Sequence, residues 1–532
     1  MDLLAAGLLP SLPASFLSGG DLDLLAPLAF TAGPELPPLP AGTPAVESRR
    51  GLAEALATAN AAYGHPRARD LARRLADPAT RVVAAGQQPG LLGGPLYTLV
   101  KAVAAARWAE RLEAAGQPAV AVFWVATEDH DFRELSRASL LTAEGPRTFT
   151  LGADPSPLMP VGMRTLGESV TEVLAAIAAA TPGDRYAAWV ERLAAWYRPE
   201  ARFGEAFCRL FAHLLGERCP LLLDAMLPAV KAAERPWLGR LIEARREVDA
   251  ALKEADRRIR EAGHPLQVPP QPGASPLFLL RRGERRKVEW EGDDGFSLRG
   301  QGEGAEPVAN LLEIVEENPG VVSPGVLARP VLQDALLGTA LFVAGPGELS
   351  YLPQAAPLYR LLDVPAPAVA LRPQVLVLEG HRLEKLPELS LTLEDLVAPG
   401  FDLEDLDRAL AGRGIGFLEE AEARLGAVLD ALREPALAIA PDLERPWEKT
   451  RDQATKALAT FAAKVRGAAA RRDDVRRRRA LDLREACRPA GELQERFVSS
   501  SHFPGKYGEA FVASLFAQLH TEAPATLQVI VP

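Results

Sequence analysis

Two stretches of the chain decide its fold: RVVAAGQQPGLLGGPLYT, residues 81–98, and AVAVFWVATEDHD, residues 119–131. Each begins with an apolar run typical of a buried strand, at residues 81–85 and 119–126, and residues 95–115 between them have a helical pattern. A strand, a helix and a second strand in this order form a βαβ unit with parallel strands. The sequence therefore predicts an open α/β sheet with both polar motifs at carboxyl ends of strands, where such sheets bind ligands.

Further apolar runs extend this predicted core, which we assign to residues 1–378. Buried strands are expected at residues 219–223, 340–344 and 366–371. Two stretches interrupt the α/β pattern, near residues 136–165 and 268–306, and the second is rich in glycine, proline and charged residues. We interpret both as connective insertions, the second as a small β element.

Beyond the core, residues 379–490 change to the pattern of long helices. Apolar residues recur at steps of three and four on both sides of a proline-bearing turn, which predicts an antiparallel helical coiled coil. These positions are Leu418, Ala421, Leu425, Val428 and Leu432, then Ala454, Leu458, Phe461 and Val465. A helical pair folded flat onto the core is the alternative. A hairpin of this length leaves an apolar stripe for a second copy, so we expect a homodimer. Residues 491–532 are expected to return to the core.

Composition and charge exclude several classes of protein. The chain has 532 residues and a net charge of -10, which argues against nonspecific wrapping of nucleic acid. Its three cysteines are far apart, which argues against a disulfide framework or a thiolate zinc site and fits a reducing cytosol. Residues 1–17 lack the basic residues of a signal peptide, and no apolar run approaches the roughly 20 residues that span a bilayer. We expect a soluble, cytoplasmic protein without nucleic-acid or membrane partners.

The first motif has the composition of a ligand-binding turn. Its glycines let the backbone turn sharply and approach a ligand, while Gln87 and Gln88 supply amide donors and acceptors. The helix beginning at Pro95 would direct its positive dipole end at phosphate or carboxylate. The motif lacks the Gly-Lys-Ser/Thr of a Walker loop and the spacing of the dinucleotide fingerprint, so NAD is not inferred. A purely structural turn is the alternative.

The second motif places Glu128, Asp129, His130 and Asp131 directly after a strand. Like charges this close repel and displace pKa values, so these four residues are the candidate catalytic groups. His130 could transfer a proton or bind a phosphate, and Asp129 or Asp131 could bind an amine. A divalent metal site is the rival interpretation, although no metal is firmly predicted.

Two further motifs flank the predicted strand at residues 340–344. RPVLQD, residues 329–334, precedes it, and GPGELSY, residues 345–351, follows it. Residues 345–351 have the same arrangement as the first motif, in which a strand is followed by a glycine turn and a helix. This arrangement brings Glu348 and Tyr351 to the same sheet edge. Arg329 either binds an anion or forms an ion pair with Asp334. An ordinary strand-to-helix turn is the alternative.

Together with LQER, residues 493–496, and KYG, residues 506–508, these motifs resemble the BshC family, the cysteine ligases of bacillithiol biosynthesis. The resemblance covers most of the chain. It implies a Rossmann-like core similar in layout to class I aminoacyl-tRNA synthetases, with connective insertions and a dimerising coiled coil. It also implies a carbon–nitrogen ligase that joins the carboxyl group of cysteine to the amine of glucosaminyl-malate, the last step to bacillithiol.

The resemblance carries a set of site residues. The substrate-binding residues expected from the motifs are Gly86, Gln87, Gln88, Gly93, Gly94, Tyr97, Thr98, Arg329, Gln333, Asp334, Gly347, Glu348 and Tyr351. Family members are similar in holding a nucleotide between the coiled coil and the core. The candidates for that role are Arg372, Gln374, Arg496, Lys506 and Tyr507. Gln374 departs from the family, which usually has a hydroxyl residue there, and the C-terminal segment could equally just strap the helices to the core.

ATP or ADP is the expected nucleotide, since amide formation from a free carboxylate requires activation. Whether it is a substrate or a regulator stays open. Two other functions also stay open: a metal-dependent hydrolase centred on residues 128–131, and a noncatalytic, synthetase-like binding protein.

Overall fold

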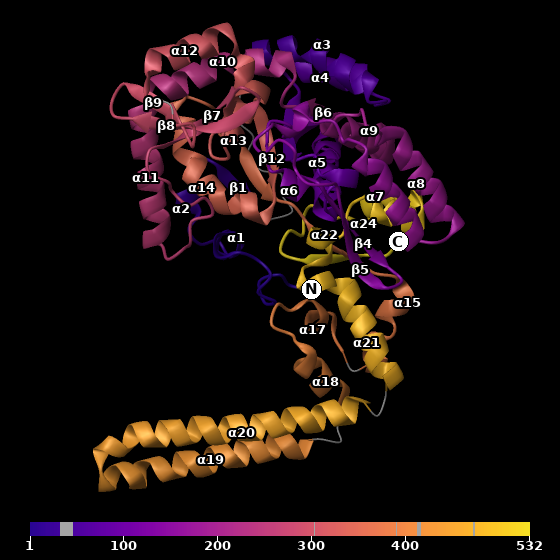
Figure 1. Cartoon of the computed structure of the whole chain (residues 1–532), viewed down its shortest axis with the longest axis vertical. Helices are drawn as coiled ribbons and strands as arrows, with labels where there is room; N and C mark the ends of the chain where they lie inside the picture. Colours follow the sequence, from indigo (N-terminus) through magenta and orange to yellow (C-terminus); the bar gives the residue numbers. More distant parts are fainter. Residues whose placement is uncertain (32–45, 303, 390, 412–415, 472–473) are drawn as a thin grey trace. The chain divides into compact units, whose positions relative to one another are not determined.

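The computed structural model describes residues 1–31, 46–302, 304–389, 391–411, 416–471 and 474–532 (Figure 1). These residues form two compact units, one of Met1–Val377 with Gln494–Pro532 and the other of Leu378–Leu493. The first unit contains parallel strands and helices, and the second is helical. The predicted fold class, an α/β core with a helical C-terminal region, is confirmed.

A parallel sheet of six strands, in the order β1-β13-β12-β2-β3-β6, forms the centre of the first unit. The strands are β1 (Ala29–Thr31), β2 (Arg81–Gln87), β3 (Ala119–Val125), β6 (Leu221–Asp224), β12 (Thr339–Ala344) and β13 (Ala368–Leu371). The sequence predicted each of them except β1. That strand is only three residues long and joins the edge beside β13, so it has no detectable period of its own.

The strand order reverses between β2 and β12. From β2 the chain passes through α5 (Leu96–Ala114) to β3 and later to β6 on one side, whereas β12 and β13 are added on the other side. The connections that leave β2 and β12 therefore diverge, and a crevice opens at the carboxyl ends of these two strands.

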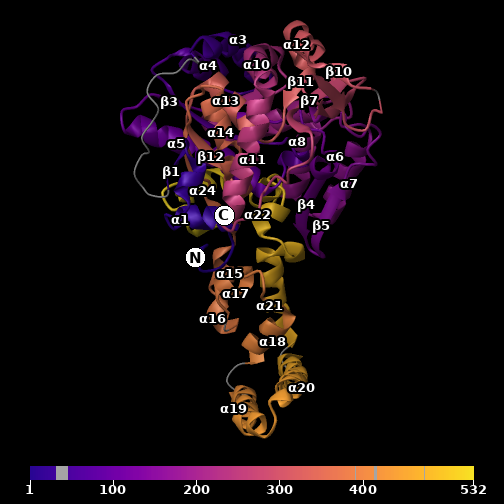
Figure 2. The ribbon, with the colours of Figure 1, turned by 90° about the vertical axis from the view of Figure 1, so that its left-hand side faces the viewer.

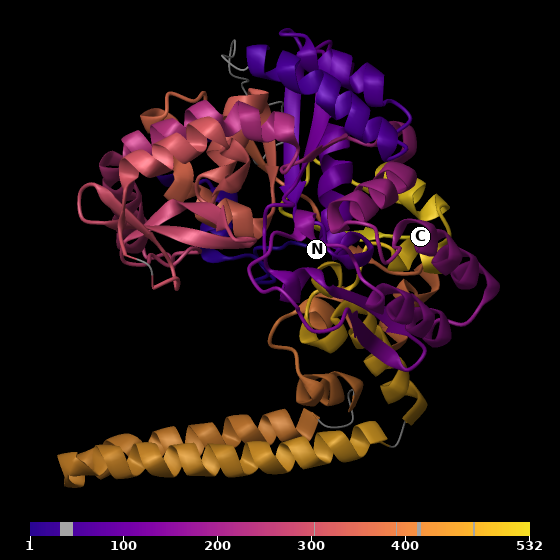
Figure 3. The ribbon, with the colours of Figure 1, turned by 45° about the horizontal axis from the view of Figure 1, so that its top comes forward.

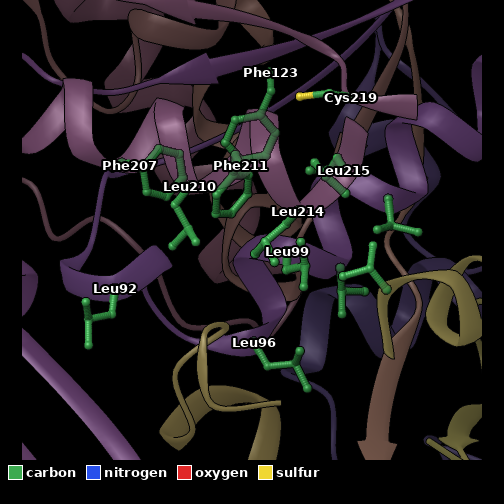
Figure 4. Packing of buried hydrophobic residues seen from close by; sticks show 14 of the residues in the cluster. Leu92, Leu96, Leu99, Phe123, Phe207, Leu210, Phe211, Leu214, Leu215 and Cys219 are labelled. Atoms are coloured by element: carbon green, nitrogen blue, oxygen red, sulfur yellow. The ribbon is translucent and has the colours of Figure 1, made fainter. Parts of the chain in front are cut away.

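Both faces of the sheet are covered because alternate residues of each strand point to opposite sides. On one face Val83 and Phe123 pack with α5 and with α9 (Phe203–Leu215). Figure 4 shows Phe123 together with Phe207 and Phe211 of α9. The ring centroid of Phe211 lies 5.8 Å from that of Phe123 and 4.2 Å from that of Phe207. On the other face Val82 and Trp124 belong to a second core that includes residues of α3 (Val46–Ala62), α10 (Pro228–Glu243) and α14 (Pro346–Leu361).

Two antiparallel β elements interrupt this core. The first is the hairpin of β4 (Arg137–Thr142) and β5 (Gly145–Thr150). The second is a five-stranded sheet in the order β10-β9-β8-β7-β11 (Figure 3). Its strands are β7 (Ala274–Arg281), β8 (Glu284–Glu291), β9 (Gly295–Leu298), β10 (Glu306–Pro307) and β11 (Val322–Pro324). We refer to this second element as the inserted sheet.

The C-terminal segment belongs to the first unit. It contains α22 (Gln494–Phe497), α23 (His502–Tyr507), α24 (Ala510–Gln518) and β15 (Leu527–Ile530). β15 pairs in parallel with β14 (Gln374–Val377). The other helices of this unit are α1 (Ser11–Leu17), α2 (Leu22–Leu25), α4 (Ala68–Ala76), α6 (Phe132–Leu135), α7 (Ser169–Ala180), α8 (Asp184–Trp196), α11 (Arg245–Glu261), α12 (Val308–Glu317) and α13 (Arg329–Leu337).

In the helical unit, α19 (Gly416–Ile439) and α20 (Glu444–Arg471) lie side by side and antiparallel, and Figure 2 views them nearly end-on. Leu418, Leu429 and Ala462 are buried between the helices of this unit. The predicted apolar seam is wrong at three positions, because Val428, Leu432 and Phe461 are 58%, 55% and 59% exposed. An α-helix has 3.6 residues per turn, so the row of side chains on its buried face can step by three or by four residues. After Leu425 this row steps by four, to Leu429, whereas the prediction stepped by three, to Val428.

The remaining helices of this unit are α15 (Gly380–Leu383), α16 (Leu386–Leu389), α17 (Leu393–Val397), α18 (Leu403–Ala411) and α21 (Asp474–Cys487). Within the parts of the chain that the structure describes, no helix has both the length and the apolar character needed to cross a membrane.

Candidate active site

A cavity of about 340 Å³ lies at the crevice between β2 and β12. Predicted site residues from four motifs meet in its wall. They are Gly86, Gln87 and Gln88 at the end of β2, Glu128, Asp129 and His130 after β3, Arg329 on α13, and Glu348 and Tyr351 on α14. The inserted sheet adds Phe278, Arg285 and Lys287, which the sequence analysis did not single out. The folded chain thus converts motifs far apart in the sequence into one site.

Close packing explains two glycines of the first motif. A Cβ atom on Gly86 would lie 2.9 Å from the carbonyl oxygen of Trp124, and one on Gly90 would lie 2.7 Å from the Cα atom of Gly94. Neither approach is possible for a larger residue without a shift of the backbone. These two glycines therefore serve the close contact of β2 with β3 and the tight turn that follows.

The second half of the first motif does not line the cavity. Ser500 donates its backbone N–H to the carbonyl oxygen of Gly94 at 2.7 Å, and the N–H of Leu96 donates to the carbonyl oxygen of Val498 at 2.8 Å. The C-terminal segment therefore covers the start of α5. The backbone N–H of Leu96, in the first turn of this helix, therefore has a protein partner, and the role of the helix N-terminus in holding a substrate anion stays a prediction. Gly93, Gly94, Tyr97 and Thr98 shape this junction.

A buried lysine that the sequence analysis missed holds the end of β2. Lys101 Nζ donates to the carbonyl oxygen of Gly86 at 2.8 Å and to Gln87 Oε1 at 2.9 Å, and it forms an ion pair with Glu348. Burial lowers the pKa of Lys101, and the carboxylate of Glu348 opposes that shift. The sequence did offer one indication of this role, because Lys101 is a single charged residue within the apolar stretch of α5.

Glu348 connects α14 to this lysine and to Arg329. Its Oε2 accepts the backbone N–H of Gly345 at 2.8 Å, and its Oε1 lies 3.6 Å from Arg329 Nη2. The same nitrogen of Arg329 donates to the hydroxyl of Tyr351 at 2.8 Å. One carboxylate between two cations leaves net positive charge at this end of the cavity, which suits a substrate carboxylate.

Asp334 does not line the cavity, and it forms no ion pair with Arg329. Its carboxylate accepts hydrogen bonds from the hydroxyl of Tyr359 at 2.6 Å and from Gln333 Nε2 at 3.2 Å in the core. Burial raises the pKa of Asp334 to about 6. On a helix, a residue five positions on from Arg329 points to a different side, which explains the difference. Gln333 and Gly347 are likewise absent from the wall of the cavity.

Glu128 belongs to a buried ion triad. Lys231 Nζ on α10 lies 2.5 Å from Glu128 Oε2 and 2.8 Å from Glu234 Oε2. Burial, and secondarily the charge of Glu128, raise the pKa of Glu234, while Lys231 opposes the rise. Glu128 therefore reaches the cavity as a carboxylate that a buried cation holds in place. Lys231 and Glu234 were missed because they lie about 100 residues from Glu128, at a separation of 103 for the lysine.

Asp129 and Asp131 have different surroundings. Asp129 Oδ1 accepts the backbone N–H of His130 at 2.6 Å, and Asp129 Oδ2 accepts a hydrogen bond from the side chain of Gln88. Asp131 instead accepts the N–H of Glu134 at 3.1 Å and caps α6. Of the four predicted catalytic residues, Asp131 is thus a helix cap outside the cavity wall.

The protonation of His130 follows from its neighbour. Arg285 Nη1 lies 3.2 Å from His130 Nδ1, and a guanidinium can only donate. Nδ1 must therefore accept, so the ring hydrogen of the neutral imidazole is on Nε2. Burial and the charge of Arg285 lower the pKa of His130. The imidazole of His130 is consequently neutral near pH 7, with its Nε2–H as a hydrogen-bond donor.

Arg285 and Lys287 occupy one face of β8, as residues two apart do in a strand. Arg285 donates through Nε to Ser323 Oγ at 2.8 Å and through Nη2 to the carbonyl oxygen of Pro324 at 2.9 Å. Its guanidinium lies 3.8 Å from the ring centroid of Phe278, and Lys287 Nζ lies 4.5 Å from the same centroid. Burial, and secondarily the charge of Arg285, lower the pKa of Lys287 to about 8.

The candidate nucleotide contacts lie elsewhere in the first unit. Arg372 forms a bidentate ion pair with Glu495 at 2.7 and 2.9 Å, and its guanidinium lies 5.4 Å from the ring centroid of Tyr97. Gln374 is fully buried on β14. Lys506 Nζ lies 4.9 Å from the ring centroid of Tyr507. These residues and Arg496 are absent from the wall of the 340 Å³ cavity. Among the described residues, no group of three or more His, Cys, Asp or Glu side chains could hold a metal ion.

A parallel sheet with a polar cavity at its switch point, lined by carboxylates, an imidazole and cations, defines a Rossmann-like enzyme. Residues 41–373 match the family described as bacillithiol biosynthesis BshC, N-terminal Rossmann-like domain. Residues 375–530 match the C-terminal coiled-coil domain of the same family. The chain belongs to the BshC family, and the expectation from the motifs is confirmed.

Curated relatives agree with this assignment. A protein of Salinibacter ruber named "Putative cysteine ligase BshC" is 32% identical over 90% of this chain and 88% of its own length. A relative of the same name from Heliobacterium modesticaldum is 33% identical over 84% of this chain and 83% of its own length. One from Geobacillus kaustophilus is 28% identical, with 82% of each chain covered. The enzyme class that these relatives share is ligase.

Proposed function

We propose that this protein joins the carboxyl group of cysteine to the amine of glucosaminyl-malate, the last step of bacillithiol biosynthesis. A ligase for this reaction must hold a carboxylate and an amine against each other in one site. The observation that carries the proposal is the cavity at the switch point, whose wall contains Arg329 together with Glu128 and Asp129. The family membership agrees with it.

Each side chain suits a definite role. Arg329 with Tyr351 would bind the carboxyl group of cysteine, because a guanidinium matches a carboxylate in geometry and charge. Glu128 and Asp129 would hold the substrate amine and accept its proton. The Nε2–H of His130 would donate a hydrogen bond to the oxygen that becomes the amide carbonyl.

ATP is the proposed source of free energy, since a free carboxylate does not condense spontaneously with an amine in water. Its proposed contacts are Arg372, Gln374, Arg496, Lys506 and Tyr507. Arg372 Nε and both polar side-chain atoms of Gln374 are buried and have no hydrogen-bond partner among the described residues, which supports a contact to a bound group. The proposed reaction needs both ATP and free cysteine, which the cytoplasm supplies, so we propose that it takes place there.

A homodimer through the helical unit is also proposed. Val428, Leu432 and Phe461 are more than half exposed, and large apolar side chains gathered on one helical pair favour a second apolar surface. Sedimentation should give a dimer for the wild type and a monomer for Leu432→Glu with Phe461→Glu. Leu22→Glu, at an exposed leucine of the other unit, is the matched control. A wild type that stays monomeric at micromolar concentration would rule the dimer out.

The decisive test of the reaction is a thiol profile in cells. A strain that lacks this gene should lose bacillithiol and accumulate glucosaminyl-malate. The wild-type gene should restore bacillithiol, whereas Arg329→Met should not, because the cationic end of the cavity is lost. Arg257→Met removes an exposed arginine and serves as the control. Unchanged bacillithiol in the deletion strain would refute the proposed function.

A further inference from the structure

A second cavity of about 630 Å³ adjoins the candidate active site. The two cavities share His130, Phe278, Arg285, Lys287, Gly325 and Val326 in their walls. The larger one continues along α11 and residues 268–276. Both volumes fall in the range of small-molecule sites, about 300–1,000 Å³. The site therefore has two compartments, and the shared residues form the junction between them.

The junction carries two cations, and neither forms an ion pair with a carboxylate of the residues that the structure describes; the charges of Glu128 and Asp129 act on Arg285 only at longer range. Within the described parts of the chain, Arg285 donates to Ser323, Pro324 and His130, none of which is an anion. Lys287 has no hydrogen bond or ion pair in the part of the chain that the structure describes, and only the ring of Phe278 faces its ammonium group closely. Taking a charge out of water without pairing it is costly, so this pair favours an anionic ligand.

The other cations of the larger cavity differ in this respect. Lys253 lies 2.7 Å from Asp249, Arg286 lies 2.6 Å from Glu284, and Arg299 lies 2.6 Å from Glu289. Each of them is neutralised by a neighbouring carboxylate. The unpaired positive charge of this cavity is therefore concentrated at the junction, beside His130.

We propose that Arg285 and Lys287 bind the two carboxylates of the malate group of the sugar acceptor, with the sugar ring in the larger cavity. This inference rests on the proposed function. Two fixed cations match a dicarboxylate in charge. The three N–H groups of Lys287 and the remaining N–H groups of Arg285 supply donors for both carboxylates.

The chemistry of the acceptor makes this placement productive. In a glucosaminide, the amine and the glycosidic oxygen are on neighbouring carbons, so an anchored malate group keeps the amine close to the junction. The amine then lies beside His130 and Asp129, and the smaller cavity is left for cysteine near Arg329. The inserted sheet would thus select the acceptor, while the Rossmann-like sheet supplies the groups that face the reaction.

Calorimetric titration of the purified full chain tests this inference without turnover. The ligands are malate, glucosaminyl-malate and methyl glucosaminide, which lacks the carboxylates. Lys287→Met should weaken binding of malate and glucosaminyl-malate about 10- to 100-fold, as expected for the loss of a charged hydrogen bond. Binding of methyl glucosaminide should change less than about threefold, on the same scale. Lys449→Met, at an exposed lysine of the helical unit, is the matched control.

The pH dependence of malate binding to the wild-type protein is a second test of the inference. Malate affinity should fall as the pH rises through about 8, where the pKa of Lys287 lies. The charged groups that face Lys287 are Arg285 and Arg299, which lower this pKa, and Glu289, which raises it. Lys287→Met should lose this pH dependence.

Several outcomes would overturn the inference. Malate that fails to bind wild type, or binds Lys287→Met equally well, would do so. If Lys287→Met lost ATP binding but retained malate binding, the two cations would be assigned to phosphate instead. Conversely, carboxylate binding that depends on Lys287 in a protein dispensable for bacillithiol would uphold a dicarboxylate site at the junction, but would refute the proposed function and with it the assignment of that site to the sugar acceptor.

Discussion

Replacing Lys231 with methionine should destabilise the α/β unit severely. The ammonium group lies 2.5 and 2.8 Å from the carboxylates of Glu128 and Glu234, and side-chain exposure across the triad is 5%, 6% and 0%. The variant removes the ammonium group that lies within ion-pair distance of both buried carboxylates. Removing one partner of a buried ion pair costs about 3–5 kcal/mol, a large part of the about 5–15 kcal/mol that stabilises a typical domain.

The loss of unfolding free energy in Lys231→Met should depend on pH, and the buried carboxyl groups determine the direction of that dependence. Burial already raises the pKa of Glu234 to about 7, so the folded protein favours its neutral form more than the unfolded chain does. Without Lys231 this preference strengthens, because the group that stabilised the ionised form is gone. The destabilisation should therefore be greatest at pH 8 and shrink towards pH 5, as the carboxyl groups take up protons.

The chain offers a matched control for this experiment. Arg257 on α11 also lies between two carboxylates, Glu254 and Glu261, each at 2.5 Å, but the three side chains are 55%, 53% and 60% exposed. Arg257→Met should shift the urea midpoint far less, because water screens exposed pairs. The second variant Lys231→Met with Glu234→Gln should recover part of the loss.

Urea unfolding followed by tryptophan fluorescence at pH 5 and pH 8 measures these differences. Equal midpoint shifts for Lys231→Met and Arg257→Met would refute the reasoning. A penalty for Lys231→Met that stays constant between the two pH values would refute the account of the buried carboxylates.

Other predictions concern single contacts. Tyr359→Phe should cost about 2 kcal/mol at pH 8 and less at pH 5, because it removes the hydrogen bond to Asp334, whose pKa is about 6; equal urea-unfolding losses at both pH values would contradict this. Gly86→Ala should lower the unfolding free energy by about 1–3 kcal/mol, whereas Gly239→Ala, where a Cβ meets no atom within 4 Å, should not; similar urea midpoints would contradict the packing argument. The cysteine thiols should resist a colorimetric thiol reagent in the native protein and react after unfolding, since burial raises each pKa; prompt native labelling of all of them would contradict this. They are Cys208, Cys219 and Cys487.

Local pattern was sufficient for much of the fold. The apolar runs at β2, β3 and β12 identified strands because a buried parallel strand is apolar on both faces. Polar residues at the ends of those strands predicted the site, since all the carboxyl ends of a parallel sheet meet at one edge. The family resemblance carried the functional expectation, because its motifs are specific in composition and order.

Local pattern failed where a side chain's role depends on a distant partner. The hydrogen bond between Arg285 and His130 joins residues 155 positions apart, and Lys231 meets Glu128 across 103 positions. Neither contact leaves a periodic signal in the sequence. Asp131 and Asp334 were assigned to the site because they adjoin its residues in the chain, yet the helices turn them elsewhere.

The sequence alone therefore determined the α/β core, the helical unit and the sheet edge at which the candidate site lies, because these follow from short-range periodicity. Tertiary structure alone decided which side chains share a cavity, which ring nitrogen of His130 carries the hydrogen, and where unpaired positive charge lies. Those properties depend on burial and on charges a few ångströms away in space, and segments from opposite ends of a unit supply them.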